Sequence, residues 1–230
     1  MNFFVFDIGG TNTKYGLMDE KGNFVEGPDK KLTSKENLID DLIRIVGSTE
    51  GDFDSVGVSC CGVVDMKNGT VKYARNLGDD IGIGKKLEEH TGKKVFVGND
   101  GDVAALGESV YGKGKKYSRV AYVGFGTGLA GGFCVGGKIP EKKEDYETEF
   151  GSIHINGKRW KCVCSGSLMH EIYRDHNQKN GNIMDKRLSS EDIFELASKG
   201  DSMAMQFVED VLGEYNSKKK KKIIENFRPD

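Results

Sequence analysis

Two short segments of this chain combine glycine with residue types that hold phosphate groups. The segment DIGGT begins at Asp7, and the segment GFGTG ends at Gly128. Glycine accepts positive φ angles and has no Cβ, so a bulky anion can approach the backbone N–H groups at such a bend. A threonine hydroxyl adds one more donor. Two bends of this kind predict a site that binds the phosphates of a nucleotide.

Asp7 needs a separate explanation, because a carboxylate repels a phosphate unless a cation lies between them. We interpret it as a partner of Mg²⁺, direct or through water, since Mg²⁺ keeps several waters and is held by few carboxylates. Lys14 adds positive charge nearby. The alternative is purely structural, because hairpin bends need glycine and aspartate favours turns. The second glycine bend favours the binding interpretation.

A third segment, VFVGND, supplies a candidate catalytic base. It ends in Asn99 and Asp100 at the end of a predicted strand. Phosphoryl transfer to a hydroxyl needs a positioned base more than covalent chemistry, and a carboxylate at a strand end suits that role. The alternative for Asp100 is a helix cap. We assign capping to Asp102 instead, which lies two residues further along.

Strands and helices alternate in the order needed to position these segments. Apolar runs and turn residues predict a strand–helix alternation with a mixed sheet, and Thr33 with Glu36 forms a capping-box pattern before an apolar helix. A Gly/Lys linker, GKGKKYS, precedes a second hairpin with a glycine-rich bend. The predicted strands are 3–6, 13–18, one near 24, 55–60, 70–74 and 94–99, and the predicted helices are 38–46, 85–91, 103–111, 167–174, 190–198 and one from 202.

Composition limits the classes of function. The chain has 230 residues, of which 37% are hydrophobic and 30% charged, with a formal net charge of -2. This balance gives no basic excess for binding nucleic acid, and no apolar stretch approaches the roughly 20 residues of a membrane-spanning helix. The N-terminus has no signal-peptide pattern. Five cysteines do not suggest a disulfide framework, so we expect a cytoplasmic protein.

Four motifs in order resemble the ROK family of repressors and sugar kinases, within the actin-like ATPase superfamily. They are DIGGTNTKYGLMD, GVSCCGVVDMKNGTV, VGNDGDVAALGE and VGFGTGLAGGFCVGGKI. The resemblance implies a two-lobed, ribonuclease H-like α/β fold with mixed sheets flanked by helices. We place the boundary between the lobes at the Gly/Lys linker, which divides the chain into residues 1–115 and 116–230. The resemblance also implies that nucleotide and Mg²⁺ bind at the two glycine bends, through Asp7, Gly9, Gly10, Thr11, Lys14, Gly126, Thr127 and Gly128, with Asp7 as the metal partner.

The same resemblance implies an ATP-dependent hexose kinase in which Asp100 accepts the proton of the sugar hydroxyl, at O6 in most relatives. The sugar is glucose or an N-acetylhexosamine. The implied sugar contacts are Gly62, Asn76, Asn99, Asp100 and Glu149. Glu149 lies among other acids, so an ordinary surface position is its alternative. A homodimer is compatible with the resemblance.

The sequence departs from the family pattern at two places. The family's zinc-binding histidine is replaced by Ser152, and Cys162 and Cys164 are followed by no third cysteine. We therefore expect no structural zinc, although His154 and His170 leave a rearranged site open. The second departure is the C-terminal lobe, which we expect to be incomplete because the chain ends where the family's adenosine-binding segment would begin. The alternative function is therefore a non-catalytic or truncated sugar-binding relative. Regulators of the family carry an N-terminal helix-turn-helix, which we do not expect here because the first strand begins at Asn2.

Overall fold

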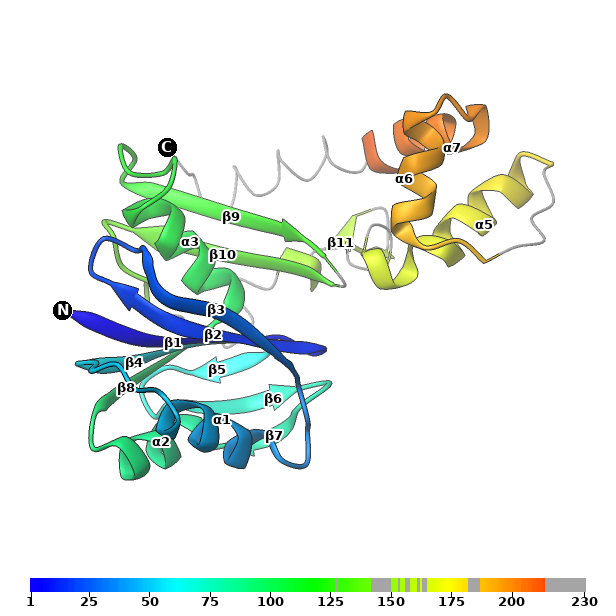
Figure 1. The fold of residues 1–230 in the computed structure, drawn as a ribbon. Coiled ribbons are helices and arrows are strands. Elements are labelled where there is room, and N and C mark those ends of the chain that lie inside the picture. Colours follow the sequence, from blue (N-terminus) through cyan, green and yellow to red (C-terminus); the bar gives the residue numbers. More distant parts are fainter. Residues whose placement is uncertain are drawn as a thin grey trace.

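Strands and helices alternate as far as Val135, and helices predominate after that point (Figure 1). The computed structural model describes residues 1–126, 128–141, 150–152, 154–155, 158–160, 162, 165–181 and 187–213. The elements up to the second glycine bend are β1 Asn2–Ile8, β2 Asn12–Asp19, β3 Phe24–Leu32, α1 Leu38–Gly47, β4 Ser55–Cys60, β5 Val63–Asp65, β6 Thr70–Ala74, β7 Gly78–Ile81, α2 Ile83–Thr91, β8 Lys94–Asn99, α3 Asp100–Val110 and β9 Arg119–Phe125.

The main sheet has five strands in the order β3-β2-β1-β4-β8. β1 to β3 form an antiparallel meander, whereas β4 and β8 run parallel to β1. Alternate residues of β1, namely Phe4, Phe6 and Ile8, are buried in one core cluster with Leu42 of α1 and Leu87 of α2. This period of two is what a strand with one buried face requires. The opposite face of β1 is left to carry Asp7.

A smaller sheet and a hairpin complete the part of the fold that holds the site. The smaller sheet has three strands in the order β5-β6-β7. The hairpin pairs β9 with β10, Leu129–Val135. α3 packs against both hairpin strands and lies between them and the main sheet (Figure 1). The mixed sheet with flanking helices confirms the predicted α/β class, and the division near residue 115 stays a prediction.

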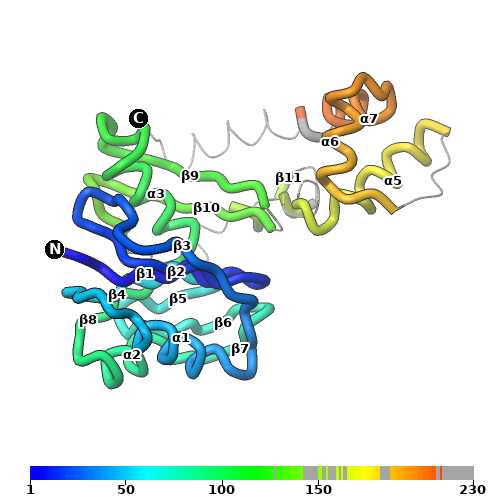
Figure 2. The backbone as a smooth tube through the Cα atoms, in the orientation of Figure 1, coloured from blue at the N-terminus to red at the C-terminus, as the bar shows by residue number. Residues whose placement is uncertain are grey.

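Beyond the hairpin tip, the described C-terminal helices form a separate group with its own core (Figure 2). Tyr173 and Phe207 lie at its centre, with ring centroids 5.0 Å apart in an edge-to-face arrangement. Among the described helices, none is long and apolar enough to cross a bilayer. The remaining elements are the 3₁₀ turn η1 Phe150–Ser152, β11 His154–Ile155, β12 Lys158–Arg159, the 3₁₀ turn η2 Gly166–Leu168, α5 Met169–Lys179, α6 Ser190–Ser198, α7 Ser202–Phe207 and the π-helical turn η3 Val208–Gly213.

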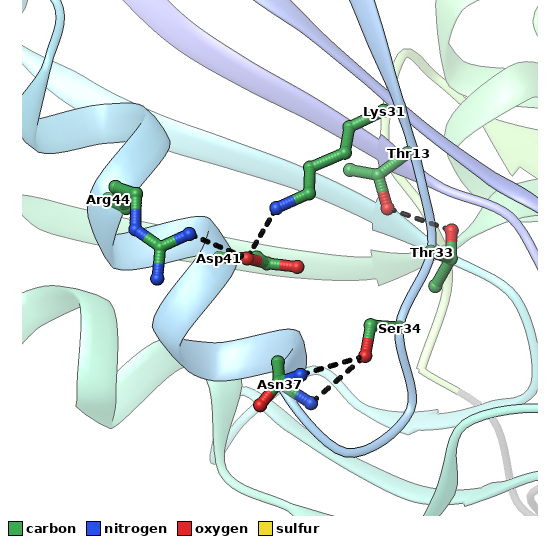
Figure 3. Close-up of polar contacts among 7 residues, drawn as sticks. All are labelled: Thr13, Lys31, Thr33, Ser34, Asn37, Asp41 and Arg44. Atoms are coloured by element: carbon green, nitrogen blue, oxygen red, sulfur yellow. Dashed lines mark hydrogen bonds and ion pairs between the residues drawn. The ribbon is translucent and has the colours of Figure 1, made fainter.

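The capping box predicted for α1 is wrong. The helix begins at Leu38, and its N-cap is Asn37, which makes no side-chain capping bond. Thr33 lies upstream of the helix and donates its hydroxyl hydrogen to the Gly9 carbonyl at 2.9 Å. Figure 3 shows Thr33 directed at Thr13 of β2 and away from the start of α1. A tertiary contact has therefore taken the hydroxyl that the local pattern assigned to the helix.

Candidate active site

The first glycine turn joins β1 to β2 and lies beside Asp7. The Gly9 N–H donates to the Asn12 carbonyl at 3.0 Å and closes the turn. Asp7 is directly opposite Lys14 in the antiparallel register, and opposed residues share one face of a sheet. Both side chains are exposed. The turn thus presents a carboxylate and an ammonium group on the same face of the sheet.

Asp7 has a fixed hydrogen-bond donor on the neighbouring strand. Ser59 lies beside it in the parallel β1–β4 register, and the Ser59 hydroxyl donates to Asp7 Oδ1 at 3.1 Å. This bond holds one carboxylate oxygen in place. An exposed, oriented carboxylate beside the first glycine turn fits the donor set of Mg²⁺, which uses one or two carboxylates and several waters.

The three parallel strands end together and bring the predicted residues to one edge of the sheet. Ile8, Cys60 and Asn99 lie in one row, since Ile8 pairs with Cys60 and Cys60 pairs with Asn99. Ligands of open α/β sheets bind at the carboxyl ends of such strands. The residues after this row are the first glycine turn, the turn at Gly62, and Asp100.

Asn99 fixes the start of α3 and therefore the position of Asp100. Its Oδ1 accepts from the N–H of Gly101 at 3.0 Å and of Asp102 at 3.2 Å, and its Nδ2 donates to the Gly62 carbonyl at 2.8 Å. Asn99 is thus the N-cap, and the prediction that Asp102 caps the helix is wrong. Asn99 is preferred because it stands at the last strand residue, where its extended backbone (φ −65°, ψ 141°) suits a cap.

Asp100 is the first residue of α3 and lies in an environment that opposes its ionisation. Burial raises the pKa of this carboxyl, and the negative charges of Asp7 and Asp102 raise it further. The N–H of Gly101, which donates to Asp100 Oδ1 at 2.8 Å, opposes the shift only in part. A carboxyl with a raised pKa is a better proton acceptor when ionised.

A Cβ would overlap backbone at Gly62, and at Gly10 it would overlap a neighbouring side chain. Gly62 has φ +100°, and a Cβ there would overlap the carbonyl of Tyr73 on β6. A Cβ on Gly10 would overlap the side-chain amide of Asn76. The predicted sugar residue Asn76 is therefore in contact with the predicted phosphate turn.

The second glycine bend is joined to the helix that carries Asp100. A Cβ on Gly101 would overlap the backbone of Gly131, and a Cβ on Gly132 would overlap the backbone of Gly101. These glycines allow α3 and β10 to approach closely. Asp102, which is fully buried, accepts from the Phe133 N–H of β10 at 3.4 Å. The candidate base and the second hairpin thus form one packed unit.

An open cavity of about 1440 Å³ extends from the second glycine bend into the C-terminal helices. Gly126 is at its edge, where its carbonyl accepts from the Gly166 N–H at 2.9 Å. Arg187, which lines this cavity, forms an ion pair with Glu171, with 3.6 Å between the guanidinium nitrogen and Glu171 Oε1. Its lining residues are Phe125, Gly126, Gly166, Ser167, Met169, His170, Arg187, Leu188, Ser189, Ser190, Glu191, Asp192, Phe194, Val208, Glu209 and Gly213. Space next to the second glycine bend, which is predicted to bind phosphate, suits the nucleoside of a nucleotide.

The family model described as "ROK family" matches residues 4–230. The chain belongs to the ROK family. A glucokinase of Thermotoga maritima is 27% identical over 86% of this chain and 70% of its own length. A glucokinase of Streptomyces coelicolor is 32% identical over 73% of this chain, which spans only 54% of that enzyme.

Solved structures of ROK proteins share this fold. The ROK family glucokinase from Streptomyces griseus, crystallised with glucose and AMPPNP, has a TM-score of 0.82 and 26% identity, and covers 100% of this chain and 81% of its own. The predicted actin-like, two-lobed architecture is thereby confirmed.

Several predictions made from the ROK resemblance fall on residues that the structure does not describe. Thr127 of the second bend and the sugar candidate Glu149 both lie outside the described residues. Of the zinc candidates, Cys164 lies outside them too, whereas Cys162 is exposed and His170 Nδ1 accepts from the Leu188 N–H at 3.1 Å. The roles of these residues stay predictions.

Two contacts that support this ROK site were not predicted from the sequence. Ser59 orients Asp7, and Thr33 holds the glycine turn. The contact of Ser59 could have been predicted, because Ser59 lies one residue before the end of a predicted strand, as Asp7 lies near the end of another. The contact of Thr33 could not, since it spans 24 residues of sequence.

Proposed function

We propose that this protein is an ATP-dependent hexose kinase with Asp100 as its general base. The observation that supports this most is the position of Asp100, which is partly buried at the edge of the sheet. Asp7 lies close enough for its negative charge to raise the pKa of Asp100. Phosphoryl transfer requires a base for the hydroxyl and a cation beside the phosphates, and these two carboxylates are suited to one role each.

In the proposed reaction, Asp100 accepts the proton of a hexose hydroxyl while that oxygen attacks the γ-phosphorus of ATP. The new O–P bond forms as the bond to ADP breaks, and the proton stays on the Asp100 carboxyl. Its raised pKa favours that final state. We propose the 6-hydroxyl as acceptor, because the resemblance to ROK sugar kinases implies it.

The first glycine turn and the second bend are the proposed phosphate contacts. Gly9, Gly10 and Thr11 offer backbone on one side, with Lys14 on the same face as Asp7. Gly126 and Gly128 are exposed, and a Cβ on either would meet no atom within 4 Å, so we propose that phosphate approaches on the other side there. Asp7, oriented by Ser59, would hold Mg²⁺, which neutralises charge on the phosphates when bound.

The proposed sugar contacts lie at the same edge of the sheet as the first glycine turn. The carbonyl of Gly62 is fixed by Asn99, and Asn76 reaches the turn at Gly10. The Asn99 amide uses one of its two hydrogens on Gly62, which leaves the other for a hydroxyl. Glucose is the proposed first substrate, since the similar proteins from Thermotoga maritima and Streptomyces coelicolor are glucokinases.

A hexose panel offered with MgATP tests this proposal. We expect hexose-dependent ADP release with glucose, and a new phosphomonoester signal by phosphorus-31 NMR. Asp100→Asn should lower kcat by about 10²-fold or more, as loss of a general base does. Asp52→Asn is the matched control, because Asp52 is exposed and precedes β4 at the far end of the sheet. Glucose binding by calorimetry without any ADP release would instead favour a non-catalytic sugar-binding relative.

A further inference from the structure

Thr33 touches the first glycine turn at two points, although it lies beyond the end of β3. Its backbone N–H donates to the Thr11 carbonyl at 3.0 Å, and its hydroxyl donates to the Gly9 carbonyl at 2.9 Å. The hydroxyl oxygens of Thr33 and Thr13 are 3.0 Å apart and face one another (Figure 3). Carbonyls at both ends of the turn are thus held by one residue.

The direction of these bonds follows from the single hydrogen of each hydroxyl. Because the Thr33 hydroxyl donates to Gly9, its contact with Thr13 must use the Thr13 hydrogen. The order is therefore Thr13 to Thr33 to the Gly9 carbonyl. Thr13 is only 4% exposed, so water competes poorly for this chain of bonds.

Holding these carbonyls also directs the N–H groups of the turn. A trans peptide places its N–H opposite its C=O, and the peptides after Gly9 and Thr11 are trans. With both carbonyls turned toward Thr33, the N–H groups of Gly10 and Asn12 point away from it. These N–H groups are donors of the kind that a phosphate needs.

We infer that Thr33 is a positioning residue for phosphate binding, which acts by fixing the orientation of the first glycine turn. The inference rests on the proposed function, since it assigns that turn to the nucleotide. Thr33 does not contact the ligand in this account. It sets which backbone groups of the turn the ligand meets.

Thr33→Val is the informative variant, because valine keeps the shape and the backbone N–H and removes the hydroxyl. Two readouts are needed: amide hydrogen exchange of residues 9–12 by mass spectrometry, and MgATP affinity by calorimetry in the absence of hexose. We expect faster exchange in the turn and an affinity about tenfold weaker, with glucose affinity unchanged, as expected for one lost hydrogen bond. Thr33→Ser, which retains the hydroxyl, should restore both values.

Thr91→Val is the matched control, since the Thr91 hydroxyl donates to the Leu87 carbonyl at 2.7 Å at the end of α2, and it should change neither readout. Exchange or MgATP affinity equal to that of the wild type in Thr33→Val would overturn the inference. A wild-type protein that binds no MgATP would instead overturn the proposed function. If Thr33→Val does not fold, Thr13→Val removes only the first hydroxyl of the chain. It should accelerate exchange in the same turn, and unchanged exchange would again overturn the inference.

Discussion

Replacing Asn99 by alanine removes three hydrogen bonds that fix the start of α3. Two are capping bonds to the N–H groups of Gly101 and Asp102, and loss of an asparagine cap costs about 1 kcal/mol. The third comes from Nδ2 to the Gly62 carbonyl, and a partly buried acceptor left without a partner costs about 1–3 kcal/mol. Asn99 is 7% exposed, so water replaces these bonds poorly. We therefore expect Asn99→Ala to lower the free energy of unfolding by about 2–4 kcal/mol.

Urea unfolding followed by circular dichroism measures this change. Asn37→Ala is the matched control, because Asn37 is also an N-cap but makes no side-chain capping bond. This variant should change the free energy of unfolding by no more than about 0.5 kcal/mol. Equal stability of Asn99→Ala and Asn37→Ala would refute the role given to Asn99.

The remaining predictions concern Asp100 and the glycine contacts. The folded-state pKa of Asp100 is raised above its ordinary 3.8, so protonation of this carboxyl favours the folded state, and that stability is lost as pH rises through the raised pKa. Asp100→Asn should therefore have a higher Tm than the wild type at pH 7. An equal or lower Tm would contradict the direction of the pKa shift. Carbon-13 NMR titration should place the Asp100 pKa above 3.8 and show it falling in Asp7→Asn. The added methyl group of Gly132→Ala would overlap the backbone of Gly101, so this variant should lower the free energy of unfolding in urea by about 3 kcal/mol. The methyl group of Gly126→Ala would meet no atom within 4 Å, so this variant should leave the free energy of unfolding unchanged and weaken MgATP binding.

The strands and glycine bends of this fold were predictable because their signals are local. The apolar run from Phe3 to Phe6 marks a strand in the sequence, and the structure buries Phe4 and Phe6 in the core. Gly9 and Gly10 mark the turn for the same local reason. The short strands β5 and β7 were missed, since three or four residues carry too little periodicity.

Other features could not be read from the sequence, because they depend on contacts between distant segments. Asn99 and Asp102 are both good capping residues, and only the end of β8 decides between them. In the sequence, Thr33 fits the pattern of a capping box. In the folded protein its hydroxyl donates instead to the carbonyl of Gly9, which is distant in sequence. Gly132 resembles part of a ligand-binding bend, but its lack of a Cβ serves the packing of β10 against α3.

The central claim is that Asp100 faces a sugar hydroxyl while the two glycine bends hold the phosphates. A crystal structure with glucose, Mg²⁺ and a non-hydrolysable ATP analogue measures this directly. We predict a carboxylate oxygen of Asp100 within about 3 Å of one glucose hydroxyl, with the terminal phosphate between Gly10 and Gly126. Glucose bound with Asp100 directed away from every hydroxyl, or phosphates bound away from both bends, would contradict the claim.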